Sequence, residues 1–212
     1  MRDGIPGCTA FNGNRREAMA AMGLTQNIPE EEPTEPHDYV LPIMYKIWDM
    51  ADAPIDINIC AQSDKYDGYT CILRYKSRNL VKGLTQGDNT AGVDRTARLA
   101  TMVPNTITPS ARLQIEGEVI TNTNDPVQAS YAMFGATRRE FADLGCKFIA
   151  FDVRGHNFPT WTQAMEWLGS EGFDTVLNTN LPDYPKDGIV YKIDEVAVHD
   201  LAEIKQFAFK FY

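Results

Sequence analysis

Residues 62–83, QSDKYDGYTCILRYKSRNLVKG, place a lysine two positions before an Asp-Gly pair and follow it with two β-rich runs. The runs flank a polar Lys-Ser-Arg-Asn segment, and this pattern predicts a β-hairpin over residues 70–85. A lysine beside a turn is usually only a solvated charge on the surface. Whether Lys65 carries chemistry must therefore be judged from the rest of the chain.

The composition is that of an ordinary globular protein, with 43% hydrophobic and 23% charged residues among 212. No apolar run approaches the ~20 residues of a membrane span. The opening MRDGIPG also lacks the apolar region of a secretory signal. We therefore expect no membrane partner and a cytoplasmic location, either in the protein's own cell or in a host.

The charge balance restricts which partners the surface can bind. Twenty Lys and Arg against twenty-nine Asp and Glu give a net charge of -9, which repels a phosphate backbone. A nucleic-acid partner therefore requires a local basic patch or another subunit. Basic residues gather around the predicted hairpin and at one later pair: Arg74, Lys76, Arg78, Lys82 and Arg138-Arg139. A hairpin face that is simply solvated is an equally good interpretation of the first group.

The cysteines and histidines are widely scattered and show no zinc-binding spacing. We expect the thiols to be reduced, the histidines to be structural and no side chains to form a metal-ligand set. The residues concerned are Cys8, Cys60, Cys71, Cys146, His37, His156 and His199.

The N-terminal part differs in character from the remainder. Residues 13–22 favour a short helix, and the Pro-rich acidic stretch 27–38, NIPEEEPTEPHD, favours an extended strap. We therefore expect an N-terminal helix and strap over residues 1–36 and one main domain over residues 37–212. The apolar spacing of residues 40–52 predicts a helix at the start of that domain.

The main domain alternates strands and helices without a regular βαβ rhythm. A glycine-rich loop at residues 86–92 leads into a helix whose amides could face an anion. Strands are predicted at 111–120, 146–155, 187–194 and 205–212, and helices at 131–145 and 161–173. This order predicts an α+β fold of mainly antiparallel sheets flanked by helices.

Two later lysines bear on the role of Lys65. An ordinary lysine has a pKa of ~10.4 and is protonated at neutral pH, so a lysine nucleophile needs desolvation or nearby positive charge to become a free amine. Lys192 and Lys210 lie on predicted strands between apolar residues, so each points to the face opposite its neighbours. Taken alone, both are also explained as surface lysines.

Six motifs occur in a characteristic order: KYDG (65–68), LTQGDNTAGVDRTA (84–97), IEGEV (115–119), FIAFDV (148–153), YPKDGIVYKID (184–194) and FAFKF (207–211). From about His37 onward, this succession resembles the covalent nucleotidyltransferase superfamily, and within it the adenylation domain of NAD-dependent DNA ligases. The hairpin and glycine loop look like the arginine-tyrosine hairpin and GDGTTGED-type loop of those ligases. Asp187-Gly188 and a single Lys210 favour the same branch over ATP-dependent relatives.

The resemblance implies a nucleotidyltransferase domain of ATP-grasp-like fold in which Lys65 takes AMP as a phosphoramide. It implies nucleotide contacts from Asp67, Gly68, Gln86, Glu118, Phe151 and Asp187, and α-phosphate contacts from Lys192 and Lys210. Glu118 matches a ribose-binding glutamate, and Phe151 matches an aromatic residue that stacks on adenine. NAD and Mg²⁺ are the implied cofactors.

The same resemblance implies transfer of AMP to the 5′-phosphate of nicked duplex DNA. Ser63 and Gln86 depart from the family, which usually has glutamate and arginine there. A second polypeptide, or a continuation of the chain, would supply an OB-fold and further DNA-binding domains, as in a split viral ligase. Two alternatives stay open: an ATP-dependent polynucleotide ligase subunit, and a nucleotide-binding interaction subunit without turnover.

Overall fold

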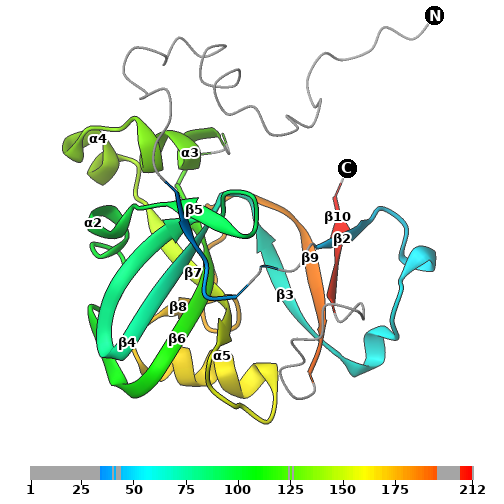
Figure 1. The fold of residues 1–212 in the computed structure, drawn as a ribbon. Helices are drawn as coiled ribbons and strands as arrows, with labels where there is room; N and C mark the ends of the chain where they lie inside the picture. The colour runs from blue at the N-terminus through cyan, green and yellow to red at the C-terminus, as the bar shows by residue number, and fades with distance from the viewer. Residues whose placement is uncertain are drawn as a thin grey trace, which may run out of the picture.

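Two four-stranded sheets lie side by side in the computed structural model, which describes residues 34–39, 41, 44–123, 125, 127–194 and 206–211 (Figure 1). The first sheet has the order β4-β6-β7-β8, with β4 at Tyr69–Thr85, β6 at Thr106–Ile120, β7 at Lys147–Arg154 and β8 at Asp174–Thr175. The second has the order β2-β10-β9-β3, with β2 at Tyr45–Ile47, β10 at Gln206–Lys210, β9 at Lys186–Ile193 and β3 at Cys60–Tyr66. Only the β2–β10 and β7–β8 ladders are parallel among the described strands.

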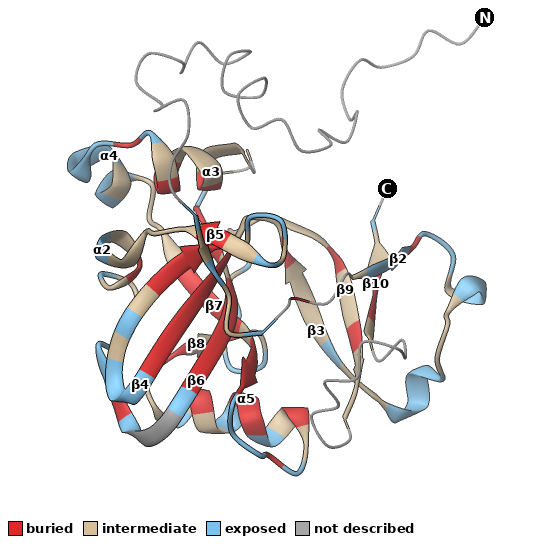
Figure 2. Cartoon of the chain, in the orientation of Figure 1, coloured by how far each residue is buried: buried red, intermediate tan, exposed pale blue. Residues whose placement is uncertain are grey.

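The main core lies on one face of the first sheet. Alternate residues of β6, such as Leu113 and Ile115, point into it, while Gln114 and Glu116 point to the opposite face. Buried residues accordingly concentrate in β4, β6 and β7 (Figure 2). The predicted sheet-rich α+β fold is thus confirmed at this level.

Short helices lie beside the first sheet: α2 at Thr96–Leu99, α3 at Val127–Phe134, α4 at Arg138–Asp143 and α5 at Trp161–Ser170. Residues of α2, α3 and α5 pack into the core, whereas α4 buries none of its residues. α5 confirms the helix predicted over 161–173, and it buries Trp161, Ala164, Met165 and Leu168. The helix predicted over 131–145 is instead two helices, because Thr137 caps a new helix with a capping box to Glu140.

The hairpin predicted over residues 70–85 is wrong. This segment is one continuous strand, β4, which pairs with β6 from Tyr69 opposite Val119 to Asn79 opposite Thr106. The Lys-Ser-Arg-Asn segment lacks the glycine that tight hairpin turns favour, and a single left-handed residue, Ser77 with φ of 62°, accompanies register shifts in the ladder. The chain therefore bulges there and continues.

The helix predicted over residues 40–52 is also wrong where the structure describes that stretch. Tyr45–Ile47 forms β2 against β10, and only Met50–Asp52 forms a 3-10 turn. Ile47 is buried in a second apolar cluster with Tyr191 and Phe207, so pairing with a distant strand overrides the local pattern.

The described end of the strap packs on the first sheet. β1, at Thr34–Pro36, pairs with β5, at Ala91–Val93. Asp38 pairs with Arg74 and Arg112, and Lys82 pairs with Glu35 and Asp94. Two of the four basic residues expected on a hairpin face are therefore occupied by internal ion pairs.

Three sequence expectations fall wholly or mainly beyond the described residues. The predicted helix 13–22, Cys8 and His199 all lie there, and the domain boundary at residue 37 stays a prediction. Among the described cysteines, Cys60, Cys71 and Cys146 are free thiols. No helix in the described ranges is long and apolar enough to cross a membrane.

Replacing Asp38 by asparagine tests the attachment of the strap. Arg74 is almost buried, so losing its carboxylate leaves a charge poorly compensated, and we expect the free energy of unfolding to fall by about 2 kcal/mol or more. Glu35→Gln is the matched control, because it removes the same charge from a more exposed ion pair on the same strap. Urea denaturation of both variants measures the difference, and equal losses would contradict the proposed importance of the Asp38 pair.

Candidate active site

One face of the second sheet carries the lysines singled out in the sequence. Gly188 in β9 lies directly between Lys65 of β3 and Lys210 of β10, and residues that face each other across a ladder share one side of a sheet. Lys192 lies on the same side, opposite Ala61 and Gln206. The structure thus brings the three lysines to one surface, while Tyr191 and Phe207 pack against the other.

An irregularity in the β3–β9 ladder places Asp187 among these lysines. Lys65 pairs with Gly188 and Tyr66 with Lys186, so Asp187 has no partner residue in the register. Such a bulge redirects a side chain. The Asp187 carboxylate lies 3.0 Å from the Lys65 ammonium and also pairs with Lys210. One carboxylate therefore bridges the two lysines.

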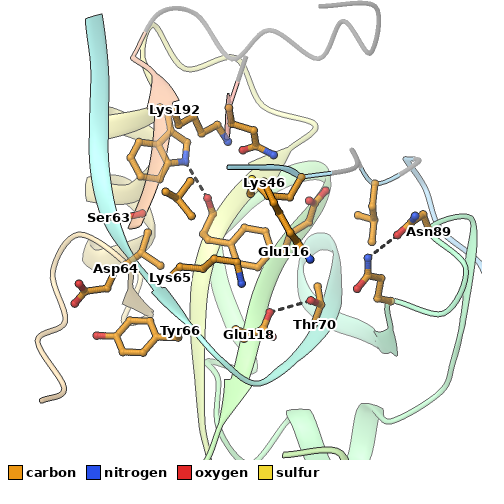
Figure 3. Close-up of a pocket in the computed structure, with 18 residues that line it drawn as sticks. Lys46, Ser63, Asp64, Lys65, Tyr66, Thr70, Asn89, Glu116, Glu118 and Lys192 are labelled. Carbon is orange, nitrogen blue, oxygen red and sulfur yellow. Dashed lines mark hydrogen bonds between the residues drawn. The ribbon is translucent and has the colours of Figure 1, made fainter. Parts of the chain in front are cut away.

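A cavity of about 330 Å³ separates this surface from the first sheet. Lys65 and Lys192 border it on one side, and Thr70, Glu116 and Glu118 border it on the other (Figure 3). Phe151 of β7 and Trp161 of α5 also contribute aromatic surface, and the Trp161 indole donates a hydrogen bond of 2.9 Å to the Phe151 carbonyl. The cavity thus has cations, carboxylates and flat rings in its walls.

Glu118 occupies the floor of the cavity opposite Lys65. Its carboxylate accepts a hydrogen bond of 2.9 Å from the Thr70 hydroxyl. Burial raises the pKa of Glu118 to about 7, and the Lys65 charge and the Thr70 hydrogen bond oppose this rise. At neutral pH the carboxyl group is therefore divided between its ionised and protonated forms.

Asp67 and Gly68 lie in the turn that joins β3 to β4. Burial raises the pKa of Asp67, as does the neighbouring Asp187, whereas Lys65 and Lys210 lower it. A Cβ added to Gly68 would lie 2.2 Å from the Val119 carbonyl oxygen. Glycine is therefore required here because the β6 backbone passes too close for any side chain.

Lys192 is held by the buried carboxylate of Asp152, which the sequence reading did not identify. The Lys192 ammonium lies 3.0 Å from that carboxylate and 5.4 Å from the centre of the Trp161 ring. Behind it, buried Glu116 and Arg154 form an ion pair of 2.8 Å. Burial raises the pKa of Glu116, with a further contribution from Asp152.

Gln86 borders the cavity from the glycine loop. Its side chain donates to the Asn89 side chain at 2.5 Å, and its carbonyl contacts the His37 ring at 2.9 Å. The loop is thereby tied to the strap. α2, which follows this loop, has no side-chain cap and only four residues, and it does not border the cavity.

The structure brings most of the predicted site residues into this one region. Lys65, Gln86, Glu118, Phe151 and Lys192 border the cavity, and Asp187 joins Lys65 to Lys210 at its edge. The sequence reading missed Lys46, Thr70, Glu116, Asp152 and Trp161, although the IEGEV motif contains Glu116 and the FIAFDV motif contains Asp152. Within the described ranges no three His, Cys, Asp or Glu residues group as a metal site would require.

The pKa of Glu118 predicts how folding stability depends on pH. Its pKa of about 7 in the folded state lies above the ordinary value of 4.5, so the folded state binds more protons between these two pH values. The contribution of Glu118 to the free energy of unfolding is therefore largest below pH 4.5, and it falls as the pH rises to about 7. We expect Glu118→Gln to reduce that fall in urea unfolding measured at pH 5 and pH 7.5. An identical fall in the variant would show that Glu118 is not the titrating group.

Comparison with known proteins indicates which family the chain resembles. The sequence model of the family described as NAD-dependent DNA ligase adenylation domain matches residues 45–143. Similar curated proteins include the DNA ligases of Sorangium cellulosum (strain So ce56), 28% identical over 66% of this chain, and of Acidiphilium cryptum (strain JF-5), 29% identical over 64%. The matches cover 25% and 26% of those proteins, so the chain spans about a quarter of their length.

A solved structure from a study of DNA binding by Lig E DNA ligases shares the fold. It superposes with a TM-score of 0.54 at 15% identity, covering 81% of this chain and 68% of the other. Over residues 45–143 the chain therefore matches the adenylation domain of NAD-dependent DNA ligases, which confirms the resemblance drawn from its motifs.

Proposed function

We propose that the chain is the adenylation component of an NAD-dependent DNA ligase and forms a covalent lysyl-AMP at Lys65. Residues 37–212 would then be a covalent nucleotidyltransferase domain of the ATP-grasp-like kind. The observation that carries this proposal is the convergence of Lys65, Lys192 and Lys210 on one side of the second sheet, where Lys65 and Lys192 border a cavity that also has carboxylates and aromatic walls.

The chemistry follows from these positions. The Lys65 amine, after losing a proton, attacks the α-phosphorus of NAD and forms a P–N bond. The P–O bond to the second phosphate breaks, and nicotinamide mononucleotide leaves with that oxygen and its electron pair. Lys192 and Lys210 would stabilise the negative charge that the phosphoryl group carries in the transition state.

The remaining cavity residues suit the adenosine portion. Phe151 and Trp161 offer aromatic surface on which a purine can stack. Glu118 would meet the ribose hydroxyls, with Asp67 near the same sugar, and Gln86 would close the side next to the glycine loop. Asp187 would hold the side chains of Lys65 and Lys210 in place until the nucleotide binds.

Mg²⁺ is part of the proposal through the phosphates of the substrate. This ion usually binds proteins through one or two carboxylates together with substrate phosphates and water. Asp67 and Asp187 are carboxylates close to the lysines and fit that mode. The ion would supply additional charge neutralisation at the phosphates.

Transfer of AMP to nicked duplex DNA completes the proposed function. A surface with a net charge of -9 opposes phosphate binding, and each protein–phosphate contact makes binding more sensitive to salt. A partner polypeptide or further domains would therefore supply most of the DNA contacts. The exposed Lys76, Arg78, Arg138 and Arg139 remain available at the surface of this chain.

Incubation with Mg²⁺ and NAD labelled in its adenylate tests the proposal, with labelled ATP in parallel. We expect protein-bound label from NAD in the unaltered chain. Lys65→Ala and Lys65→Arg should both abolish it, since guanidinium cannot be deprotonated to serve as a nucleophile. Lys186→Ala is the control, because Lys186 is a neighbouring lysine that pairs with Asp64 instead. Label from ATP alone would favour the ATP-dependent alternative, and label in Lys65→Ala would disprove the nucleophile.

Lys192→Ala and Lys210→Ala should each slow the formation of lysyl-AMP by about a hundredfold or more, the scale lost with one preorganised electrostatic contact. Lys210 shares Asp187 with Lys65, so its loss should change the melting temperature little, whereas Lys192→Ala leaves the nearly buried Asp152 carboxylate without its partner and should lower the melting temperature somewhat. Single-turnover labelling gives the rate. A large drop in melting temperature combined with an unchanged labelling rate would assign these lysines a structural role.

A further inference from the structure

Lys46 is a fourth lysine on the cavity side of the second sheet. It lies opposite Ala208 in the β2–β10 ladder, and Ala208 is in turn aligned with Val190 and Ser63. The next residue, Ile47, is buried in the apolar cluster on the other side of the sheet. Lys46 therefore points toward the same cavity as Lys65 and Lys192 (Figure 3).

Lys46 differs from the other three lysines in its charge environment. Lys65 and Lys210 share Asp187, and Lys192 pairs with Asp152. Across the described ranges no ion pair joins Lys46 to a carboxylate, and the residue is exposed. An exposed ammonium without a partner beside a proposed phosphate site is available to bind an anion.

The charge of Lys46 also reaches the site. Burial and Asp187 raise the pKa of Asp67, and Lys46 acts with Lys65 and Lys210 to lower it. The ammonium groups of Lys46, Lys65 and Lys210 therefore act on one region. NAD has two linked phosphates, and when Lys65 attacks the one that belongs to AMP, the other would lie within that region.

A second hollow of about 550 Å³ begins at Lys46. Its lining also includes Tyr45, Trp48, Asp49 and Asp52, so Lys46 borders both cavities. Trp48 follows the end of β2, is 52% exposed and lines this hollow together with Lys46. Asp49 accepts a hydrogen bond from the Ala51 amide, whereas Asp52 is exposed to solvent.

The order of these groups matches the leaving half of NAD. That half begins with a phosphate, which suits Lys46, and ends in a flat, positively charged pyridinium ring. An exposed indole and a carboxylate attract such a ring. The pyrophosphate released from ATP carries only negative charge and would meet the carboxylates of Asp49 and Asp52 unfavourably.

We propose that Lys46, Trp48 and Asp52 form a subsite for the nicotinamide mononucleotide half of NAD, next to the adenylate cavity. This inference rests on the proposed function. Lys46 binds the phosphate that leaves when Lys65 is adenylated, and Trp48 stacks on the nicotinamide ring. Asp52 provides the negative charge and makes the subsite selective for the dinucleotide over a triphosphate.

The concentration of NAD that gives half-maximal labelling tests the subsite. Lys46→Ala should raise it about tenfold or more, the effect of losing one charge-assisted contact. Trp48→Ala should raise this concentration by a smaller factor, and Trp48→Phe should bring it back close to the original value because phenylalanine retains a flat ring. Asp52→Asn should also raise it, because the variant binds NAD more weakly. Lys76→Ala is the control, because it removes the same charge from an exposed position on β4.

Nicotinamide mononucleotide alone is the second probe. Calorimetric titration should show binding to the unaltered chain and loss of binding in Lys46→Ala. If the Lys46 and Trp48 variants match the Lys76 control while Lys65 is still labelled, the subsite is overturned and the proposed function stands. If the unaltered chain takes no label from NAD, both are overturned.

Discussion

The ion pair that Asp187 makes with both Lys65 and Lys210 is the contact on which the site depends. Two ammonium groups on neighbouring strands repel each other, and a carboxylate between them offsets that repulsion. Asp187 reaches this position only because the β3–β9 ladder shifts register between Lys65 and Tyr66. The bulge is therefore part of the charge arrangement. In the proposed reaction, an incoming phosphate would take over the charge compensation that Asp187 and Asp152 provide in the free chain.

Close approach of backbones is the second constraint. Gly188 lies between the two lysine strands, and a Cβ there would lie 2.2 Å from the Phe209 carbonyl oxygen. Gly68 faces the same restriction where β6 crosses the β3–β4 turn. Each glycine follows an aspartate of the site, so the Asp-Gly pairs in the two motifs have a common explanation. The aspartate supplies charge, and the glycine lets the adjacent strand come near enough to use it.

The sequence allowed part of the site to be predicted because strand alternation is a local property. Lys192 and Lys210 could be assigned to the face opposite their apolar neighbours from a few residues each, and their register with Lys65 agrees. Lys46 could not be found in this way. Its surroundings looked helical, and its strand exists only because β10, far along the chain, pairs with it. Asp152 and Trp161 were missed for a similar reason, since each reaches Lys192 through tertiary packing.

The same distinction explains the error at β4. Local residues predicted two short strands, but the length of β4 is determined by β6, which pairs with it along most of its course. This long strand has a consequence for the site. Its first residues place Thr70 beside Glu118, and its end at Thr85 leads directly into Gln86 on the cavity wall. A hairpin would have turned the chain back before the glycine loop.

Glu118 links the electrostatics of the free chain to the proposed binding of adenosine. A carboxyl group whose pKa is about 7 exists in both forms at neutral pH, so it can either donate or accept a hydrogen bond. Ribose hydroxyls can do both as well, and either form of Glu118 would therefore find a partner. The Lys65 ammonium favours the ionised form of Glu118. Once Lys65 carries AMP it is no longer a cation, so adenylation itself would shift Glu118 toward the protonated form.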